Sequence, residues 1–578
     1  MVDPVTVEIL RNAFAAVAQE MNATLYRSAF SPIIYEMKDC SVGLFTARAE
    51  LLGQAPGLPI FLGALDEAVR VVHEHMAPRG VAEGDVYAIN DPYLTGSHLN
   101  DVTVVSPVFF DGDLVGFTAS KAHWLDVGGK DAGVSVDTTE IYQEGLRFGP
   151  IRLVHRGEFQ LDLLDILTRN SRLPRSLLGD LQAQIAACRT GERRYRGLLR
   201  RYGRTTVEAA SELIFEQAER ADREVIAAIP DGTYTADGYL DGDGVSPDPI
   251  YVRVAVTVQG SDLHIDLTGS SPQRPGCTNC GYAQTLSAAR LAYKFLINPH
   301  QPPTGGHFRA LSVTAPPGSI FAAREPAACL YYAPHLGLMI ELVLRALSDA
   351  LPGRVPAGQP SDQMNFMVAG RLPDGQVFIT GEASAVGWGA LPDDDGVNAV
   401  VNYMAGDLKN LPVEVEEAKY PLRVTRRALD PDSGGPGRFR GGLALVKEYL
   451  PTAPGCRLVL WLERTVTPAW GAAGGLPGRT ARCVIDPGGP RERVLYKANH
   501  LPLEPGVVVR CTTAGGGGYG PPWERDAQRV LDDLLDGYIS REAAEAVYGV
   551  CVRGNEVDED ATRQLRERMR RRAEEDRR

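Results

Sequence analysis

The stretch GSHLNDVTVVSPVFFDGDLVGFTASKAHWLDVGG, residues 96–129, carries the clearest structural pattern in the chain. Val and Phe alternate with smaller residues on both sides of an Asp-Gly-Asp sequence, which is typical of two strands joined by a tight turn. We place the strands at residues 102–110 and 114–122 and the turn at 111–113. A three-residue loop is a common hairpin connection. The segment therefore predicts an antiparallel hairpin.

The register of this hairpin places ionisable side chains together. If residues 110 and 114 flank the loop, the two residue numbers in each opposed pair add up to 224. Asp101 then lies opposite His123. Directly opposed side chains point to the same face, with Cβ atoms about 5 Å apart. His98 lies in the preceding loop and can curl back toward Asp101. Since a slip of one residue would move the pair to opposite faces, this convergence depends on the register.

Two imidazoles and a carboxylate at one point have the composition of a metal site. They suit zinc, manganese or iron with an open coordination position, and such an ion lowers the pKa of bound water so that hydroxide forms near neutral pH. The alternative is two separate histidines, each hydrogen-bonded at a strand end. Asp126 can be a ligand, a partner of a ligand or a general base, or it can cap the turn before Gly128 and Gly129.

The rest of the chain predicts a multidomain α+β protein, largely antiparallel β with flanking helices and a helical C-terminal tail. A chain of 578 residues exceeds what one core usually supports. We expect an N-terminal metal-binding α+β domain at 1–230, a β-rich central domain with inserted helices at 231–523, and a helical segment at 524–578. The first helix is amphipathic, with apolar residues three or four apart. These residues are Val7, Leu10, Phe14, Val17 and Met21.

Composition excludes several classes of protein. The net charge of -13 argues against a nucleic-acid binder. No apolar run of 18 residues occurs, and the N-terminus lacks the basic start and apolar block of a signal peptide, so we expect no membrane span and a cytoplasmic location. Nine scattered cysteines fit reduced thiols. The one close pair, Cys277 and Cys280, lacks the second pair that a zinc knuckle requires.

A glycine-rich sequence near the C-terminus, TAGGGGYG at 513–520, invites comparison with a phosphate-binding loop. It lacks the Lys-Ser/Thr that ends such a loop, and it does not match the dinucleotide-binding pattern. The sequence therefore predicts a tight buried turn, or a contact with substrate or a partner, and no nucleotide site.

Several ordered motifs resemble one family. NDPYLTGSHLNDVTVVSPVF (90–109), followed by AHWLDVGG (122–129), closely resembles the hydantoinase B/5-oxoprolinase family, which includes B subunits of ATP-dependent N-methylhydantoinases and lactamases and related subunits of acetone and acetophenone carboxylases. The similarity extends along nearly the whole chain. Its other motifs are DPVTVEILRNAF (3–14), DLTGSSPQRPGCTNC (266–280) and TAGGGGYGPPWERD (513–526).

The resemblance implies a metal site at His98, Asp101 and His123, with Asp39 of YEMKDCS as the fourth ligand. The chain departs from the family pattern just beyond the second histidine. It has Trp124 and Leu125 where the family often has His or Ala, and it continues as GGKDAGVSV where the family often has GG-x-x-PGS. These departures lie beside the site and bear on the identity of the substrate.

The resemblance also implies a division of labour. In the family, ATP is bound by a separate A-type (hydantoinase A-like) subunit, which phosphorylates the substrate. We therefore expect a hetero-oligomer in which this chain is a hydrolase that opens the C–N bond of a hydantoin, oxoproline or lactam ring. Hydroxide activated by the ion would be the nucleophile, Asp126 a base or orienting group, and phosphate the leaving group. The alternatives are a subunit of a ketone carboxylase of the acetone or acetophenone type and a non-catalytic scaffold of the complex.

Overall fold

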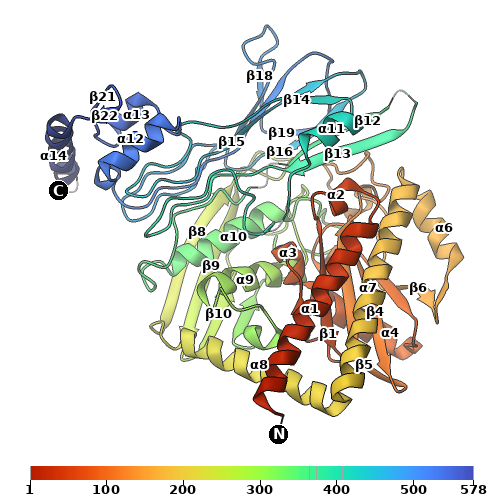
Figure 1. Ribbon diagram of the computed structural model, residues 1–578. Helices are drawn as coiled ribbons and strands as arrows, with labels where there is room; N and C mark the ends of the chain where they lie inside the picture. Colours follow the sequence, from red (N-terminus) through yellow and green to blue (C-terminus); the bar gives the residue numbers. More distant parts are fainter. Residues whose placement is uncertain (1, 363–364, 373, 407, 577–578) are drawn as a thin grey trace.

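The computed structural model describes residues 2–362, 365–372, 374–406 and 408–576. Figure 1 shows an N-terminal sheet flanked by long helices, a central sheet beside it, a β-rich layer from the second half of the chain above both, and a small helical unit at the C-terminus.

The N-terminal sheet has seven strands in the order β2-β1-β5-β4-β3-β6-β7, and all neighbours are antiparallel. The longest strands, β4 and β5, are the predicted hairpin, and they lie at the centre of the sheet. The strands are β1 (Cys40–Thr46), β2 (Leu51–Gln54), β3 (Val86–Ile89), β4 (Asp101–Phe110), β5 (Asp113–His123), β6 (Ile151–His155) and β7 (Glu158–Phe159).

Helices cover both faces of this sheet. On one face α7 (Pro174–Tyr202) packs against β4 and β5, and α1 (Pro4–Ser28) packs against α7 and α8 (Arg204–Ile226). Asp3 caps α1 by accepting a hydrogen bond from the backbone N–H of Thr6. On the other face α4 (Leu65–Met76) buries its apolar stripe. The five apolar residues predicted for the first helix are all buried, so that prediction is confirmed.

The central sheet has the order β11-β10-β9-β8 and is antiparallel except for the parallel pair β10–β11. Two helices, α9 (Tyr282–Leu296) and α10 (Ala333–Ala346), pack together, and α10 lies against β8 and β9. Their apolar side chains form the largest core of the molecule. The strands are β8 (Gly232–Leu240), β9 (Ile250–Gln259), β10 (Asp262–Asp266) and β11 (Leu311–Thr314).

Two further sheets come from the second half of the chain and share one core. The four-stranded sheet has the order β13-β12-β16-β19, and the five-stranded sheet has the order β14-β15-β20-β17-β18. Their strands are β12 (Asn365–Arg371), β13 (Val377–Ala383), β14 (Leu422–Leu429), β15 (Leu445–Pro451), β16 (Arg457–Trp461), β17 (Arg482–Ile485), β18 (Arg493–Leu495), β19 (Lys497–Pro502) and β20 (Val509–Thr512).

The glycines of TAGGGGYG are a tight buried loop, as predicted. Residues 515–518 are all buried, and each of their N–H groups donates to a carbonyl of another loop, among them the carbonyls of Gly442 and Gly358. The loop therefore serves to hold several backbone segments close together.

The C-terminal unit is small and has its own core around Val530 and Tyr548. It contains α12 (Ala527–Leu535), α13 (Arg541–Ala546), the short pair β21 (Val552–Arg553) and β22 (Glu556–Val557), and α14 (Glu559–Asp576). Figure 1 shows it projecting from one end of the β-rich layer. The remaining short helices are α2 (Pro32–Tyr35), α3 (Pro59–Leu62), α5 (Pro92–Thr95), α6 (Leu161–Arg169) and α11 (Val413–Lys419).

The predicted fold class, a multidomain α+β protein with antiparallel sheets and a helical C-terminus, is confirmed. The boundaries after residues 230 and 523 stay predictions. The largest core already includes Leu58 and Phe61 from the N-terminal part. Within the described ranges, none of the helices has both the length and the apolar character that crossing a membrane requires.

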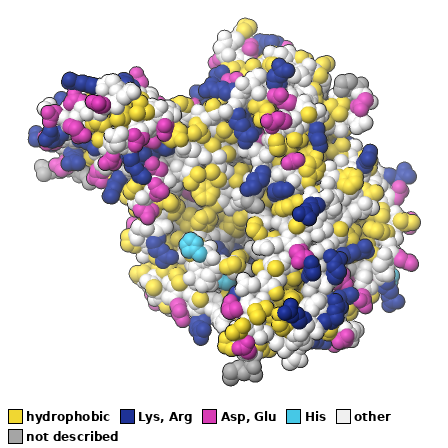
Figure 2. Space-filling view, viewed as in Figure 1, with side chains coloured by type: hydrophobic (Ala, Val, Ile, Leu, Met, Phe, Trp, Pro, Cys, Tyr) yellow, Lys and Arg dark blue, Asp and Glu magenta, His cyan; other side chains and the backbone are white. Residues whose placement is uncertain are grey.

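The face of the molecule in Figure 2 carries basic and acidic side chains in a mixed pattern. Hydrophobic side chains gather in a hollow near its middle, over the region of α3 and α9. Residues of these two helices, including Leu62 and Leu291, line a cavity of about 310 Å³.

Candidate metal centre

The hairpin of β4 and β5 brings Asp101 and His123 together. The two residues are directly paired at the open end of the ladder, as the register predicted. The turn differs from the prediction: it has two residues, Asp111 and Gly112, both with positive φ, instead of three. A β-bulge between Val108 and Phe109 shifts the pairing by one and restores the predicted register beyond it.

His98 reaches the same point from a short helix and a loop. Asp91 caps α5, and Gly96 ends it in the left-handed conformation with φ of 89°. Glycine is required there for a second reason, because a Cβ would lie 2.2 Å from the backbone nitrogen of Gln284. The N–H of Asp101 then donates to the carbonyl of His98 over 3.1 Å. The chain between helix and strand is thereby folded into a tight turn that aims His98 at Asp101.

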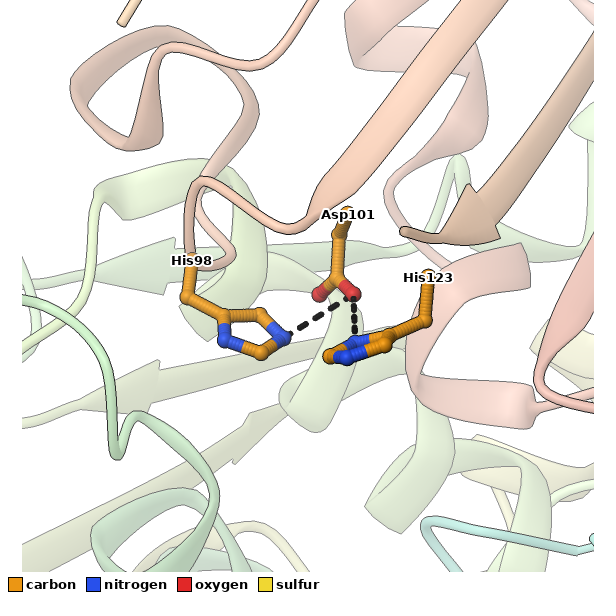
Figure 3. A group of neighbouring side chains, drawn as sticks. All are labelled: His98, Asp101 and His123. Atoms are coloured by element: carbon orange, nitrogen blue, oxygen red, sulfur yellow. Dashed lines mark hydrogen bonds and ion pairs between the residues drawn. The ribbon is translucent and has the colours of Figure 1, made fainter. Parts of the chain in front are cut away.

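Figure 3 shows the three side chains converging. Asp101 Oδ1 lies 3.0 Å from His98 Nε2 and 3.2 Å from His123 Nδ1. The other carboxylate oxygen, Oδ2, accepts a hydrogen bond of 3.1 Å from the hydroxyl of Tyr332. One potential ligand atom from each of the three residues lies within 4.8 Å of the others. The group is therefore compact enough for one ion.

Burial and neighbouring charges together set the pKa values of the two carboxylates, Asp101 and Asp39. Burial alone would raise the pKa of Asp101, but the neighbouring His98 and His123 outweigh it and hold that pKa well below its usual range. Burial raises the pKa of Asp39 to about 7, and the charge of Asp101 adds to this effect, while His123 and Lys121 act against it. Asp101 is thus the carboxylate that stays ionised.

The residues present fit a divalent cation. Three buried atoms near this point have no hydrogen-bond partner among the described residues. They are His98 Nδ1, His123 Nε2 and Asp39 Oδ1. Two imidazoles with a carboxylate are a donor set for zinc, manganese or iron. In the part of the chain that the structure describes, no other group of three such side chains comes together. Cys277 and Cys280 are therefore not part of one there.

The two further predicted residues lie in different places. Asp39 lines the same cavity as the group of three but is not one of the residues whose ligand atoms cluster. Its carbonyl accepts from the N–H of His123 over 3.2 Å. Asp126 does not join the site: it is absent from the cavity lining, and its carboxylate accepts from the backbone N–H of Arg172 over 2.6 Å and from its guanidinium over 2.8 Å. This geometry fits a residue that anchors the loop after β5.

Sequence reasoning missed Lys121 and Tyr332. Lys121 is 1% exposed, lies over the ring of Phe61 at 4.9 Å, and has a pKa that burial lowers to about 8 although Asp101 and Asp39 raise it. It lies two residues before His123, so strand alternation could have placed it on the same face. Tyr332 lies far along the chain, and no local pattern links it to the hairpin.

The group opens onto a cavity of about 120 Å³. Four parts of the chain contribute most of its walls: residues 32–61, the end of the hairpin, residues 330–333, and strands β12 and β13. Most of the lining is apolar. Besides His98, Asp101 and His123, the polar side chains in the lining are Asp39, Tyr331, Tyr332, Asn365, Thr380, Glu382 and Tyr420.

Comparisons with known proteins agree with this architecture. The family model for hydantoinase B/oxoprolinase matches residues 3–522. The B-type subunit of a putative D-/L-hydantoinase from Pseudomonas sp. strain NS671 is 32% identical over 584 residues, which cover 98% of this chain and 98% of that protein.

Two solved structures share the fold. The crystal structure of the ATP-dependent caprolactamase from Pseudomonas jessenii matches with a TM-score of 0.90 and 30% identity, over 98% of this chain and 100% of that chain. A nucleotide-free structure of acetone carboxylase matches with a TM-score of 0.89 and 20% identity, over 99% of this chain and 83% of that chain. Because the family model matches nearly the whole chain, the protein belongs to the hydantoinase B/oxoprolinase family.

Proposed function

We propose that this chain is the metal-dependent catalytic B subunit of an ATP-dependent cyclic amidase, a hydrolase that opens a hydantoin, oxoproline or lactam ring. The observation that carries the proposal is the compact group of His98, Asp101 and His123 at the wall of an apolar cavity. Relatives named as a hydantoinase component and an ATP-dependent caprolactamase support the choice of reaction.

Each residue of the site has its own task. His98, Asp101 and His123 would hold a divalent ion, and Asp39 would join them as the fourth ligand. When bound, such an ion activates water near neutral pH and polarises an oxygen of the substrate. Tyr332 orients the Asp101 carboxylate through its hydrogen bond to Oδ2. The apolar walls exclude bulk water and strengthen the electrostatic interactions inside.

A partner subunit would supply the ATP chemistry. The relative from strain NS671 is named as one of the subunits of a hydantoinase, and the caprolactamase is named as ATP-dependent. We infer that an A-type subunit in the cytoplasm phosphorylates the amide oxygen of the substrate. The ring carbon then becomes a better electrophile, and a water molecule adds to it on this chain. The C–N bond breaks as the ring nitrogen takes up a proton and leaves as an amine, which gives an acyl phosphate. A second water molecule hydrolyses the acyl phosphate to a carboxylate and free phosphate.

The second candidate is a ketone carboxylase subunit, favoured by the shared fold with acetone carboxylase. At 20% identity that likeness concerns the fold alone. A non-catalytic scaffold is the third candidate. It does not explain why three buried ligand-type side chains converge at one point.

The complex of this chain with its A-type partner tests the proposal. The complex would be incubated with ATP, lactams and hydantoins, and labelled bicarbonate, and the metal content would be measured. We expect ring opening that depends on both subunits and no fixed label. Label in a carboxylated product would favour the carboxylase, and full turnover by both His98→Ala and His123→Ala would contradict metal catalysis.

A further inference from the structure

The cavity of about 310 Å³ between α3 and α9 is separate from the metal site. Ile60 and Phe61 of α3 line the metal cavity, whereas Pro59 and Leu62 of the same helix line this second cavity. Residues three apart lie on one face of a helix, so the two cavities meet different faces of α3. Their linings have no residue in common. The second cavity is therefore a site of its own, in the hollow that Figure 2 shows.

Most of the wall of the second cavity is apolar. It is built from β1, β2, α3, α9 and the loop that follows α9. A concave space of this size, mainly apolar and with a few polar groups, has the features of a small-molecule binding site. The larger apolar side chains of the lining are Phe45, Leu51, Leu62, Leu291, Phe295 and Phe308.

The charged side chains of the described lining do not cancel one another. They are Asp66, Arg290 and Lys294, which leave one positive charge in excess. Arg290 and Lys294 are one turn apart on α9, so their side chains lie on the same face of that helix. The ammonium of Lys294 donates to the carbonyl of Asn298 over 2.6 Å and has further N–H groups to offer. This distribution favours an anionic group on a ligand.

The guanidinium of Arg290 is held in place but keeps one nitrogen free of protein bonds. Its Nη1 donates to the carbonyl of Gly63 over 2.6 Å and to the carboxylate of Asp66 over 2.7 Å, and the group lies over the ring of Phe308 at 5.1 Å. Nη2 takes part in neither bond. It is not one of the buried polar atoms that lack a partner among the described residues, so it keeps surface that a ligand can reach.

We propose that the second cavity binds a monocarboxylate with an apolar body. The carboxylate accepts a hydrogen bond from Nη2 of Arg290 and offsets the excess charge beside Lys294, while the hydrocarbon part packs against Leu291 and Phe295. An ammonium head group would meet two like charges, and a hydroxyl would leave the excess charge unbalanced. Phe295 is 38% exposed, so burial against a ligand would remove apolar surface from water.

Calorimetric titration of the full chain with octanoate, octan-1-ol and octylammonium tests the proposal. The three probes share one hydrocarbon chain and differ only in the head group. We expect octanoate to bind about ten-fold more tightly than either of the others, the size of one hydrogen bond between charged groups. Equal or tighter binding of octylammonium, equal binding of octan-1-ol, or no binding of octanoate would overturn the proposal.

Three variants locate the binding. Leu291→Trp fills the cavity and should weaken octanoate binding by about ten-fold or more, because the hydrocarbon loses its place. Arg290→Met and Lys294→Met should each reduce the preference for octanoate over octan-1-ol to within about two-fold. Arg200→Met is the control, since Arg200 is exposed on α7, away from the lining, and should keep the native preference.

The variants also decide against the proposal if it is wrong. Native affinity in Leu291→Trp would place octanoate elsewhere on the chain. A native preference in both Arg290→Met and Lys294→Met would show that these cations do not bind the head group. Since Arg290 also holds the carbonyl of Gly63, the Lys294 and Leu291 variants decide if Arg290→Met does not fold.

The hollow could instead be covered by a partner subunit, and the same preparation distinguishes this outcome. Failure of octanoate to bind the chain alone, together with protection of α9 from hydrogen exchange when the A-type partner is added, would assign the hollow to subunit contact and overturn the proposal. The titration uses neither ATP nor turnover. Its result is therefore independent of the proposed function.

Discussion

Asp101 and His123 face each other across the last pair of the β4–β5 ladder, and one oxygen of Asp101 lies within 3.2 Å of a nitrogen of each histidine of the site. The relationship links a backbone register to a candidate metal site, because the register sets which side chains meet. Its consequences can be tested residue by residue.

Removal of either histidine should remove the ion. We expect His98→Ala and His123→Ala to lower the bound metal in the purified chain to background and to reduce turnover of the complex by about 100-fold or more. His75→Ala is the control, since His75 is exposed on α4. Elemental analysis and turnover are the measurements. Metal retained at the native level in both variants would contradict the assignment.

Tyr332→Phe removes one hydroxyl and leaves the ring. The Asp101 carboxylate loses the hydrogen bond to Oδ2, so its orientation is less restricted. We expect the affinity for zinc to fall by about 10-fold to 100-fold, with a melting temperature close to that of the native chain. Competition with a chromogenic chelator measures the affinity. An unchanged affinity would show that the hydroxyl does not orient the ligand.

Two glycines with nearly equal φ separate backbone strain from crowding. Gly112 has φ of 86° and open space around its Cβ position, whereas Gly96 has φ of 89° and would meet Gln284. We expect Gly112→Ala to lower the free energy of unfolding by roughly 1–2 kcal/mol through strain alone. Gly96→Ala should cost more and also weaken metal binding, because it displaces the loop of His98. Chemical denaturation measures the loss of stability in each variant, and the chelator assay measures its metal affinity. If Gly96→Ala and Gly112→Ala changed both quantities equally, crowding of Gly96 against Gln284 would not contribute.

Glu144 should make stability depend on pH. Burial raises its pKa to about 8, although the hydroxyl of Thr138 and the N–H groups of Cys329 and Leu330 act against this. The folded chain therefore binds more protons at Glu144 than the unfolded chain between about pH 4.5 and 8. This proton uptake stabilises the folded chain fully at a pH below the pKa of Glu144 in the unfolded chain. The stabilisation is lost as the pH rises through the pKa of Glu144 in the folded chain, about 8.

Glu144→Gln removes this proton uptake. The free energy of unfolding of the variant, relative to the native chain, should rise steadily from pH 5 to pH 8. Denaturant titrations at several pH values measure the difference. A constant difference across this range would mean that Glu144 is ionised in the folded chain throughout.

The hairpin was predictable because alternation and turn residues are local signals. Its register was predicted correctly, although the turn was not, because the bulge at Val108 compensates for the shorter loop. The convergence of His98 with the strand ends followed from the same spacing. Asp39 came only from the family resemblance, and the structure places it on the cavity without clustering its carboxylate with the three.

The remaining parts of the site were beyond sequence reasoning. Tyr332 reaches Asp101 from the residue that precedes α10, and this long-range packing leaves no pattern in the local sequence. Asp126 has the right residue type and spacing for a base, but Arg172, from the turn before α7, takes its carboxylate. Whether the Asp126 carboxylate binds Arg172 or faces the site depends on the tertiary structure, which the local sequence does not reveal.

The cavity is assembled from parts of the chain that are made at different times. During translation the hairpin and the loop before it, with their three ligand-type side chains, leave the ribosome well before β12 and β13, which provide another wall of the cavity. If the proposed ion binds to these three residues, a nascent chain has the ligands for it before the pocket is complete. On an evolutionary scale the same separation lets the wall formed by β12 and β13 change by mutation while His98, Asp101 and His123 stay the same.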